Sequence, residues 1–127
     1  MMPPAALGLL LQALEPCPGE RGLVVGAASG YAAELLRSIG VEPASESGHI
    51  SGAPYDLILF DGAVEQVPAA IVAQLAVGGR LAVAIAERGV TRLMVGVKSN
   101  GGFGLRSIGD AAVPLLPGAE RPPAFVF

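Results

Sequence analysis

The sequence is short of the residues on which several kinds of site depend. Its 127 residues include no tryptophan, one cysteine (Cys17) and one histidine (His49). A single cysteine cannot form an internal disulfide and cannot build a cysteine-based metal cluster. No cysteine, aspartate or second histidine lies at metal-ligand spacing from His49, so we expect an exposed loop histidine, with neither a zinc site nor a Ser-His-Asp triad. This cysteine content favours a reducing, cytoplasmic compartment.

Charged residues are also scarce. They make up 15% of the chain, against roughly 25% in average proteins, while hydrophobic residues make up 52%. The net charge is −3 and the basic residues are not clustered, so nothing favours binding to nucleic acid or to an anionic membrane. The apolar residues 1–14 are too short to span the bilayer and lack a basic flank, which indicates a buried helix. The apolar surplus predicts a homo-oligomer, such as a dimer.

Two catalytic motifs are missing as well. The chain contains no Gly-x-Ser-x-Gly elbow and no P-loop lysine. Hydrolase and NTPase functions that depend on these motifs are therefore excluded.

The hydrophobic pattern predicts alternating helices and strands. Leucines at a 3-4-3 spacing predict a helix that starts at Pro3 and Pro4 and stops before Glu15. Apolar runs predict strands at 22–26, 55–61, 80–86, 92–98 and 103–108, with a weak edge strand at 41–46. Further helices are expected at 29–39, with Ser29 as N-cap, and at 67–75, before a Gly78-Gly79 turn.

This order of elements predicts the fold class. Strand and helix units are followed by an Asn100-Gly101-Gly102 hairpin signal. We expect a single α/β domain over residues 1–127, with a Rossmann-like, doubly wound and mostly parallel sheet. Helices on both faces would make a three-layer sandwich, and a C-terminal antiparallel hairpin would complete the sheet.

Several segments carry a family resemblance. Residues 23–31, Leu-Val-Val-Gly-Ala-Ala-Ser-Gly-Tyr, resemble the glycine motif of S-adenosylmethionine-dependent methyltransferases, and more closely that of the protein-L-isoaspartate O-methyltransferase family. Residues 10–19 are similar to the helix and turn just before the family's first strand, and residues 54–59 are similar to its fourth strand. The most specific similarity is Val67-Pro68 followed by Gln-Leu-Ala-Val-Gly-Gly-Arg-Leu at 74–81.

The resemblance also shows what this chain lacks. From the resemblance we expect that about a helix and a strand of the usual family domain are missing between Ser47 and Ala53, and that the family's N-terminal substrate segment is missing too. The resemblance therefore implies a reduced methyltransferase core.

The resemblance implies an S-adenosylmethionine site at the turn after the first strand. Its cofactor-binding positions there are Gly26, Ala28 and Gly30. The family has an acidic residue at the position of Val24 and a glycine at that of Ala28, and both departures weaken cofactor binding. The alternative is an ordinary strand-to-helix turn.

Two carboxylates complete the implied cofactor site. Glu46 falls where the family places the acid that accepts hydrogen bonds from the ribose hydroxyls, and its alternative is a solvated loop glutamate. Asp61, expected at the end of its strand, would point into the same crevice, or would simply cap the turn into Gly62-Ala63. No catalytic residue is assigned, because methyl transfer depends mainly on positioning.

Three functions stay open at this point. The first is a truncated, degenerate relative of the family with weak or lost S-adenosylmethionine binding. The second is a non-enzymatic homo-oligomeric or partner-binding module that uses the exposed sheet edge, with residues 125–127 in its interface. The third is an active carboxyl methyltransferase that a partner chain completes and that acts on isoaspartyl residues of proteins.

Overall fold

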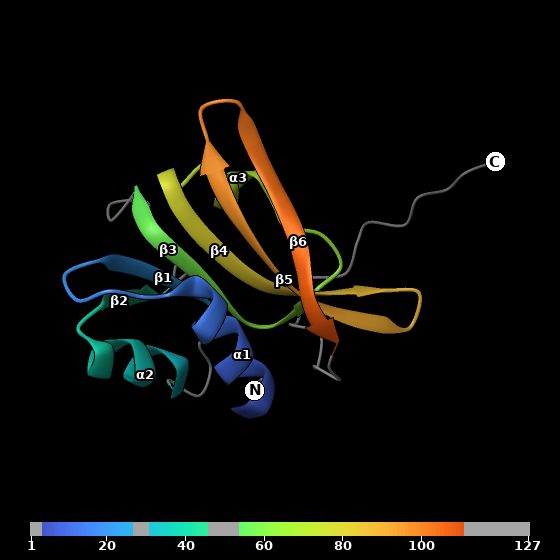
Figure 1. Cartoon of the computed structure of the whole chain (residues 1–127), viewed down its shortest axis with the longest axis horizontal. Coiled ribbons are helices and arrows are strands. Elements are labelled where there is room, and N and C mark those ends of the chain that lie inside the picture. The colour runs from blue at the N-terminus through green and yellow to red at the C-terminus, as the bar shows by residue number, and fades with distance from the viewer. Residues whose placement is uncertain (1–3, 27–30, 46–53, 111–127) are drawn as a thin grey trace.

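A computed structural model describes residues 4–26, 31–45 and 54–110 of the chain. Six strands form one mixed sheet in the order β2-β1-β3-β4-β5-β6 (Figure 1). The strands are β1 (Arg21–Val25), β2 (Glu42–Ser45), β3 (Tyr55–Val64), β4 (Leu75–Glu87), β5 (Val90–Ser99) and β6 (Gly102–Asp110). The helices are α1 (Pro4–Leu14), α2 (Tyr31–Ile39) and α3 (Ala69–Val72).

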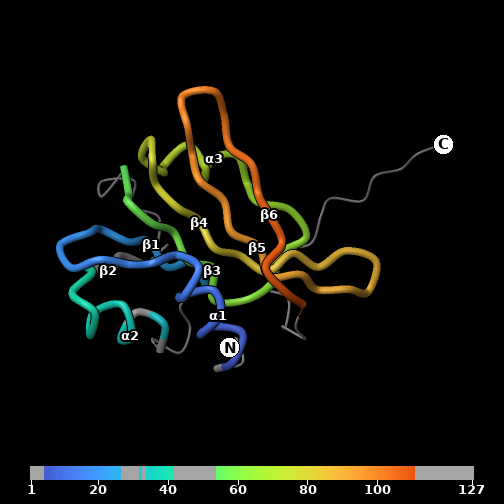
Figure 2. The backbone as a smooth tube through the Cα atoms, viewed as in Figure 1, coloured from blue at the N-terminus to red at the C-terminus, as the bar shows by residue number. Residues whose placement is uncertain are grey.

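The pairing of the strands confirms the predicted fold class. β2, β1, β3 and β4 pair in parallel, whereas β5 and β6 continue the sheet in antiparallel pairing. Figure 2 shows the β4–β5 and β5–β6 hairpins projecting from the sheet. The chain is therefore a Rossmann-like α/β domain with a C-terminal antiparallel extension. Within the described residues, no helix is long and apolar enough to cross a membrane.

The two faces of the sheet carry separate hydrophobic clusters. Buried leucines of α1 and Leu36 of α2 pack on one face against Val24, Leu57 and Leu59. The opposite face packs Ile71 of α3 together with side chains of the inner strands, such as Phe60. Helices thus lie on both faces, as the three-layer prediction requires.

Two expectations about the residues around the start of β4 are wrong. The helix expected at 67–75 is only α3, because Leu75 already pairs with Tyr55 and the Tyr55 amide donates to the Gln74 carbonyl at 2.8 Å. The turn expected at Gly78-Gly79 lies inside β4 instead. The register with β3 shifts between Leu75 and Arg80, which makes this stretch an irregularity of the strand.

One arginine joins α1 to the sheet. Nε of Arg80 on β4 donates to the carbonyl of Leu14 at 2.9 Å, and Nη2 donates to that of Glu15 at 3.1 Å. The guanidinium also forms a two-pronged ion pair with the Glu20 carboxylate, at 2.7 and 2.8 Å. Glu20 in turn accepts the Cys17 amide at 2.8 Å. The Arg80 hydrogen bond lowers the pKa of Glu20, and the same contact raises the pKa of Arg80.

A lysine on β5 binds two backbone carbonyls at and just after the end of α3. The Lys98 ammonium on β5 donates to the carbonyls of Val72 at 3.2 Å and Leu75 at 2.9 Å. We expect Lys98→Met to lower the free energy of unfolding by about 1 kcal/mol, because two carbonyls lose a charged donor while the aliphatic stem is kept. Urea denaturation measures the loss. An unchanged midpoint would show that water replaces the ammonium without cost.

Candidate cofactor crevice

The sheet has one point at which its winding reverses. From β1 the chain passes to β2 on one side, whereas β3 leads to β4 on the other side. In doubly wound sheets, ligands bind outside the carboxyl ends of the strands at such a switch point. A cofactor site in this sheet would therefore lie at the carboxyl ends of β1 and β3.

Gly26 begins the turn out of β1. Its φ of 81° lies in the left-handed region, which glycine adopts without steric cost. A glycine there also lets a ligand approach the backbone closely. The position therefore has the backbone that a nucleotide-type ligand requires.

Val24, two residues earlier, belongs to the core. Its side chain is 0% exposed and packs in the cluster that α1 and α2 cover. A carboxylate at this position would be buried among apolar side chains. The carboxyl end of β1, Val24 and Val25, therefore offers backbone but no charge to a ligand.

Asp61 lies beside Gly26. Phe60 pairs with Val25, so Gly26 and Asp61 are the next residues along two adjacent parallel strands. The Asp61 side chain is only 2% exposed. The expectation that the strand ends at Asp61 is wrong, because β3 continues to Val64. Between Leu59 and Ala63 the register with β4 is irregular, which leaves Asp61 in a bulged part of the strand.

The remaining predicted site residues cannot be compared with the structure. Ala28, Gly30 and Glu46 lie outside the described residues, as do His49 and residues 125–127. Of the five predicted cofactor positions, the described structure thus brings together Gly26 and Asp61. In the three described ranges, no group of His, Cys, Asp or Glu side chains could hold a metal ion.

No pattern in the sequence predicted the Arg80–Glu20 pair, because its members are 60 residues apart. The pair lies away from the crevice, since Arg80 is opposite Leu57 near the start of β3. Its hydrogen bonds to the end of α1 indicate a structural role. Together, sheet order and glycine turn define a doubly wound α/β domain of the methyltransferase type.

Comparisons with known proteins agree with this class. Residues 44–114 match the family model of protein-L-isoaspartate(D-aspartate) O-methyltransferase. The protein-L-isoaspartate O-methyltransferase of Methylorubrum populi is 32% identical over 91% of this chain and 69% of its own length. That of Pelotomaculum thermopropionicum is 28% identical over 92% of this chain and 65% of its own length. The chain therefore belongs to the protein-L-isoaspartate O-methyltransferase family.

Solved structures share the fold. A protein-L-isoaspartate O-methyltransferase superposes with a TM-score of 0.77 and 19% identity, over 91% of this chain and 48% of its own. A putative family member from Plasmodium falciparum, solved in complex with S-adenosyl-L-homocysteine, gives a TM-score of 0.69 and 18% identity. That superposition covers 89% of this chain and 73% of the Plasmodium chain. At these identities the likeness establishes the fold alone.

The alignments also reveal an internal difference in length. The Methylorubrum alignment runs over 146 positions but uses 91% of 127 residues, or about 116, so about 30 positions have no counterpart in this chain. That is about the size of a strand-helix-strand unit. Residues 46–54 alone connect the parallel strands β2 and β3, where such a crossover usually takes a dozen residues or more.

Proposed function

We propose that this chain is a reduced protein-L-isoaspartate O-methyltransferase domain that binds S-adenosyl ligands weakly and does not transfer methyl groups on its own. The observation that carries the proposal is the burial of Val24 in the core. This fully buried residue lies at the position where the resembling methyltransferases have an acid. The sheet and its switch point are retained, while charge at the crevice is reduced.

The described crevice residues fit such a ligand in part. Gly26 would let the ligand approach the backbone, and Asp61 would supply a carboxylate beside it. When bound, S-adenosylmethionine supplies a methyl group on its sulfonium. Transfer requires that the acceptor be held in line with that methyl group. We assign the positions that this chain lacks to the short connection between β2 and β3, where they would help to enclose the cofactor and to hold the acceptor. Their absence supports weak binding without efficient transfer.

Calorimetric titration with S-adenosyl-L-homocysteine tests the proposal. We expect a dissociation constant on the order of 10⁻⁴ M, because one backbone turn and one carboxylate remain. Saturation at micromolar ligand would contradict the proposed weakening of the site. Absence of heat at millimolar ligand would show that the crevice no longer binds the ligand, which would contradict the proposed weak binding.

Two variants on β3 locate the binding. Asp61→Asn should lower the affinity for the ligand several-fold, because it removes the one described carboxylate of the crevice. Asp56→Asn is the matched control: Asp56 lies near the start of β3, where it accepts the Arg21 amide at 3.0 Å. Equal effects of the two variants on affinity would count against the crevice as the binding site.

A transfer assay completes the test of function. With an isoaspartyl peptide and S-adenosylmethionine, we expect no methyl ester above the level seen without protein. Transfer by the chain alone would contradict the proposal and favour a working methyltransferase. The homo-oligomer expected from composition stays a prediction.

A further inference from the structure

β6 forms one outer edge of the sheet. Among the described strands it pairs with β5 alone, so alternate amide and carbonyl groups along Gly102–Asp110 point away from the sheet. It contains no proline. The other outer strand, β2, has four residues, one of which is Pro43 and has no amide hydrogen to donate. Of the two edges, β6 is the one that an added strand could extend.

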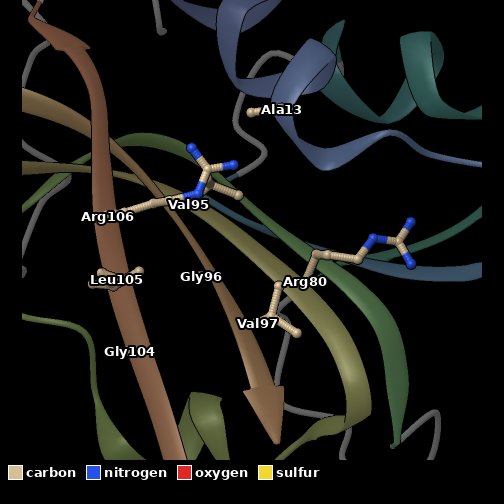
Figure 3. Close-up of a pocket in the computed structure, with 8 residues that line it drawn as sticks. All are labelled: Ala13, Arg80, Val95, Gly96, Val97, Gly104, Leu105 and Arg106. Atoms are coloured by element: carbon tan, nitrogen blue, oxygen red, sulfur yellow. The ribbon is translucent and has the colours of Figure 1, made fainter.

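A pocket of about 300 Å³ lies beside this edge, on the face of the sheet that carries α1. Figure 3 shows Val97 and Gly104 on the neighbouring strands β5 and β6, with Ala13 on α1 above them. The Val97 side chain is 54% exposed although it is aliphatic. The pocket therefore offers an apolar surface that the described residues leave open.

Gly104 makes the pocket accessible from the edge. It is paired with Val97 across the two strands. A Cβ atom added at Gly104 would meet no atom within 4 Å. At this position β6 itself therefore places no side chain between its outer edge and Val97. A strand lying beside β6 could extend an aliphatic side chain over Gly104 and onto Val97.

Arg106 supplies a charge next to this opening. It is two residues beyond Gly104, so both positions face the pocket side of β6. Its side chain is exposed and has no ion pair within the described parts of the chain. The charge of Arg80, the other arginine of the pocket, is neutralised by Glu20. Among the described residues that line the pocket, the unpaired charge is therefore that of Arg106.

We propose that β6 binds an extended acidic peptide as an additional strand. Backbone hydrogen bonds to the open edge would hold the peptide, and an aliphatic side chain would occupy the pocket over Val97. A carboxylate two residues along the peptide would pair with Arg106. The site is separate from the cofactor crevice, because the pocket lies at Arg80, opposite the start of β3.

Two labelled nine-residue peptides test the site by fluorescence anisotropy with the full chain. The first alternates threonine with valine and carries one glutamate in place of a valine near its centre. The second has lysine instead of that glutamate. We expect the glutamate peptide to bind roughly tenfold more tightly, and Arg106→Gln to remove the difference. Equal binding of the two peptides to the unmodified chain, or no binding of either, would overturn the proposal.

A second pair of variants tests the route into the pocket. Gly104→Val should lower the affinity for the glutamate peptide roughly tenfold, because the new valine side chain closes the opening over Val97. Gly109→Val is the matched control, since a Cβ there also meets no atom within 4 Å but the residue does not line the pocket. Equal losses in both variants would contradict the pocket as the binding surface.

Light scattering distinguishes a peptide from a second copy of the chain. We expect the glutamate peptide to slow amide hydrogen exchange along β6, and Gly104→Val to leave the mass from light scattering unchanged. A dimer that Gly104→Val returns to a monomer would place a second copy on this edge and overturn the peptide proposal. Neither outcome depends on S-adenosyl ligand binding, so the proposed function is tested separately.

Discussion

Replacing Arg80 with methionine is expected to lower the free energy of unfolding by about 2 to 3 kcal/mol. The variant would remove the donors to the Leu14 and Glu15 carbonyls at the end of α1. It would also leave the Glu20 carboxylate, whose side chain is 21% exposed, without its cation. Methionine keeps much of the aliphatic volume, so the loss reports on the polar contacts. Urea denaturation at pH 7 measures it.

Arg37→Met is the matched control for this loss. Arg37 pairs with Glu34 on α2, but both side chains are more than half exposed, at 58% and 71%. Exposed pairs contribute little, so we expect a change below about 0.5 kcal/mol. A loss as large as that of Arg80→Met would show that removing any arginine destabilises the domain. The assignment of a specific stabilising role to Arg80 at the end of α1 would then be wrong.

The same pair predicts a dependence of stability on pH. Arg80 holds the pKa of Glu20 below its ordinary value of 4.5, so the folded protein binds this proton less readily than the unfolded chain does. The contribution to stability is therefore fully present above pH 4.5 and is lost as the pH falls through the lowered pKa. The difference in unfolding free energy between wild type and Glu20→Gln should shrink between pH 7 and pH 3. A constant difference over this range would contradict the assignment.

The order of the elements could be predicted from the sequence because local patterns determine it. Buried parallel strands appear as continuous apolar runs, such as the Leu57–Phe60 part of β3, and α1 appears as regularly spaced leucines. The edge position of β2 followed from Pro43. The predicted order therefore agrees with the six-stranded sheet.

The limits of the strands could not be predicted, because pairing with neighbours sets them. β3 extends past Asp61 and β4 begins as early as Leu75, both through irregular pairing between these two strands. The sequence around Gly78 has the composition of a turn, and only the neighbouring strand makes it part of β4. The Arg80–Glu20 contact likewise depends on the fold, since it joins residues 60 positions apart. For the candidate site, Gly26 could be predicted from its motif, whereas the bulge around Asp61 could not.

Gly96→Ala is expected to destabilise the domain by about 2 to 3 kcal/mol, the cost of overpacking a well-packed region. Gly96 lies on β5, paired with Leu105 of β6. An added Cβ would collide with the Gly104 carbonyl oxygen, would lie 2.9 Å from Cζ of Phe103 and would lie 3.0 Å from Cδ2 of Leu105. The carbonyl belongs to the backbone of β6, so that strand itself would have to shift.

Gly104→Ala on the neighbouring strand is the control, because its Cβ meets open space and should change stability by less than about 0.5 kcal/mol. The two variants add the same methyl group to adjacent strands, so the difference in their urea midpoints measures the close approach of β5 and β6 at Gly96. Because Gly96 also lines the pocket, the displacement of β6 should carry Arg106 with it. Gly96→Ala should therefore weaken binding of the glutamate peptide to the protein that stays folded. Equal urea midpoints for the two variants would show that β6 is not held closely against β5.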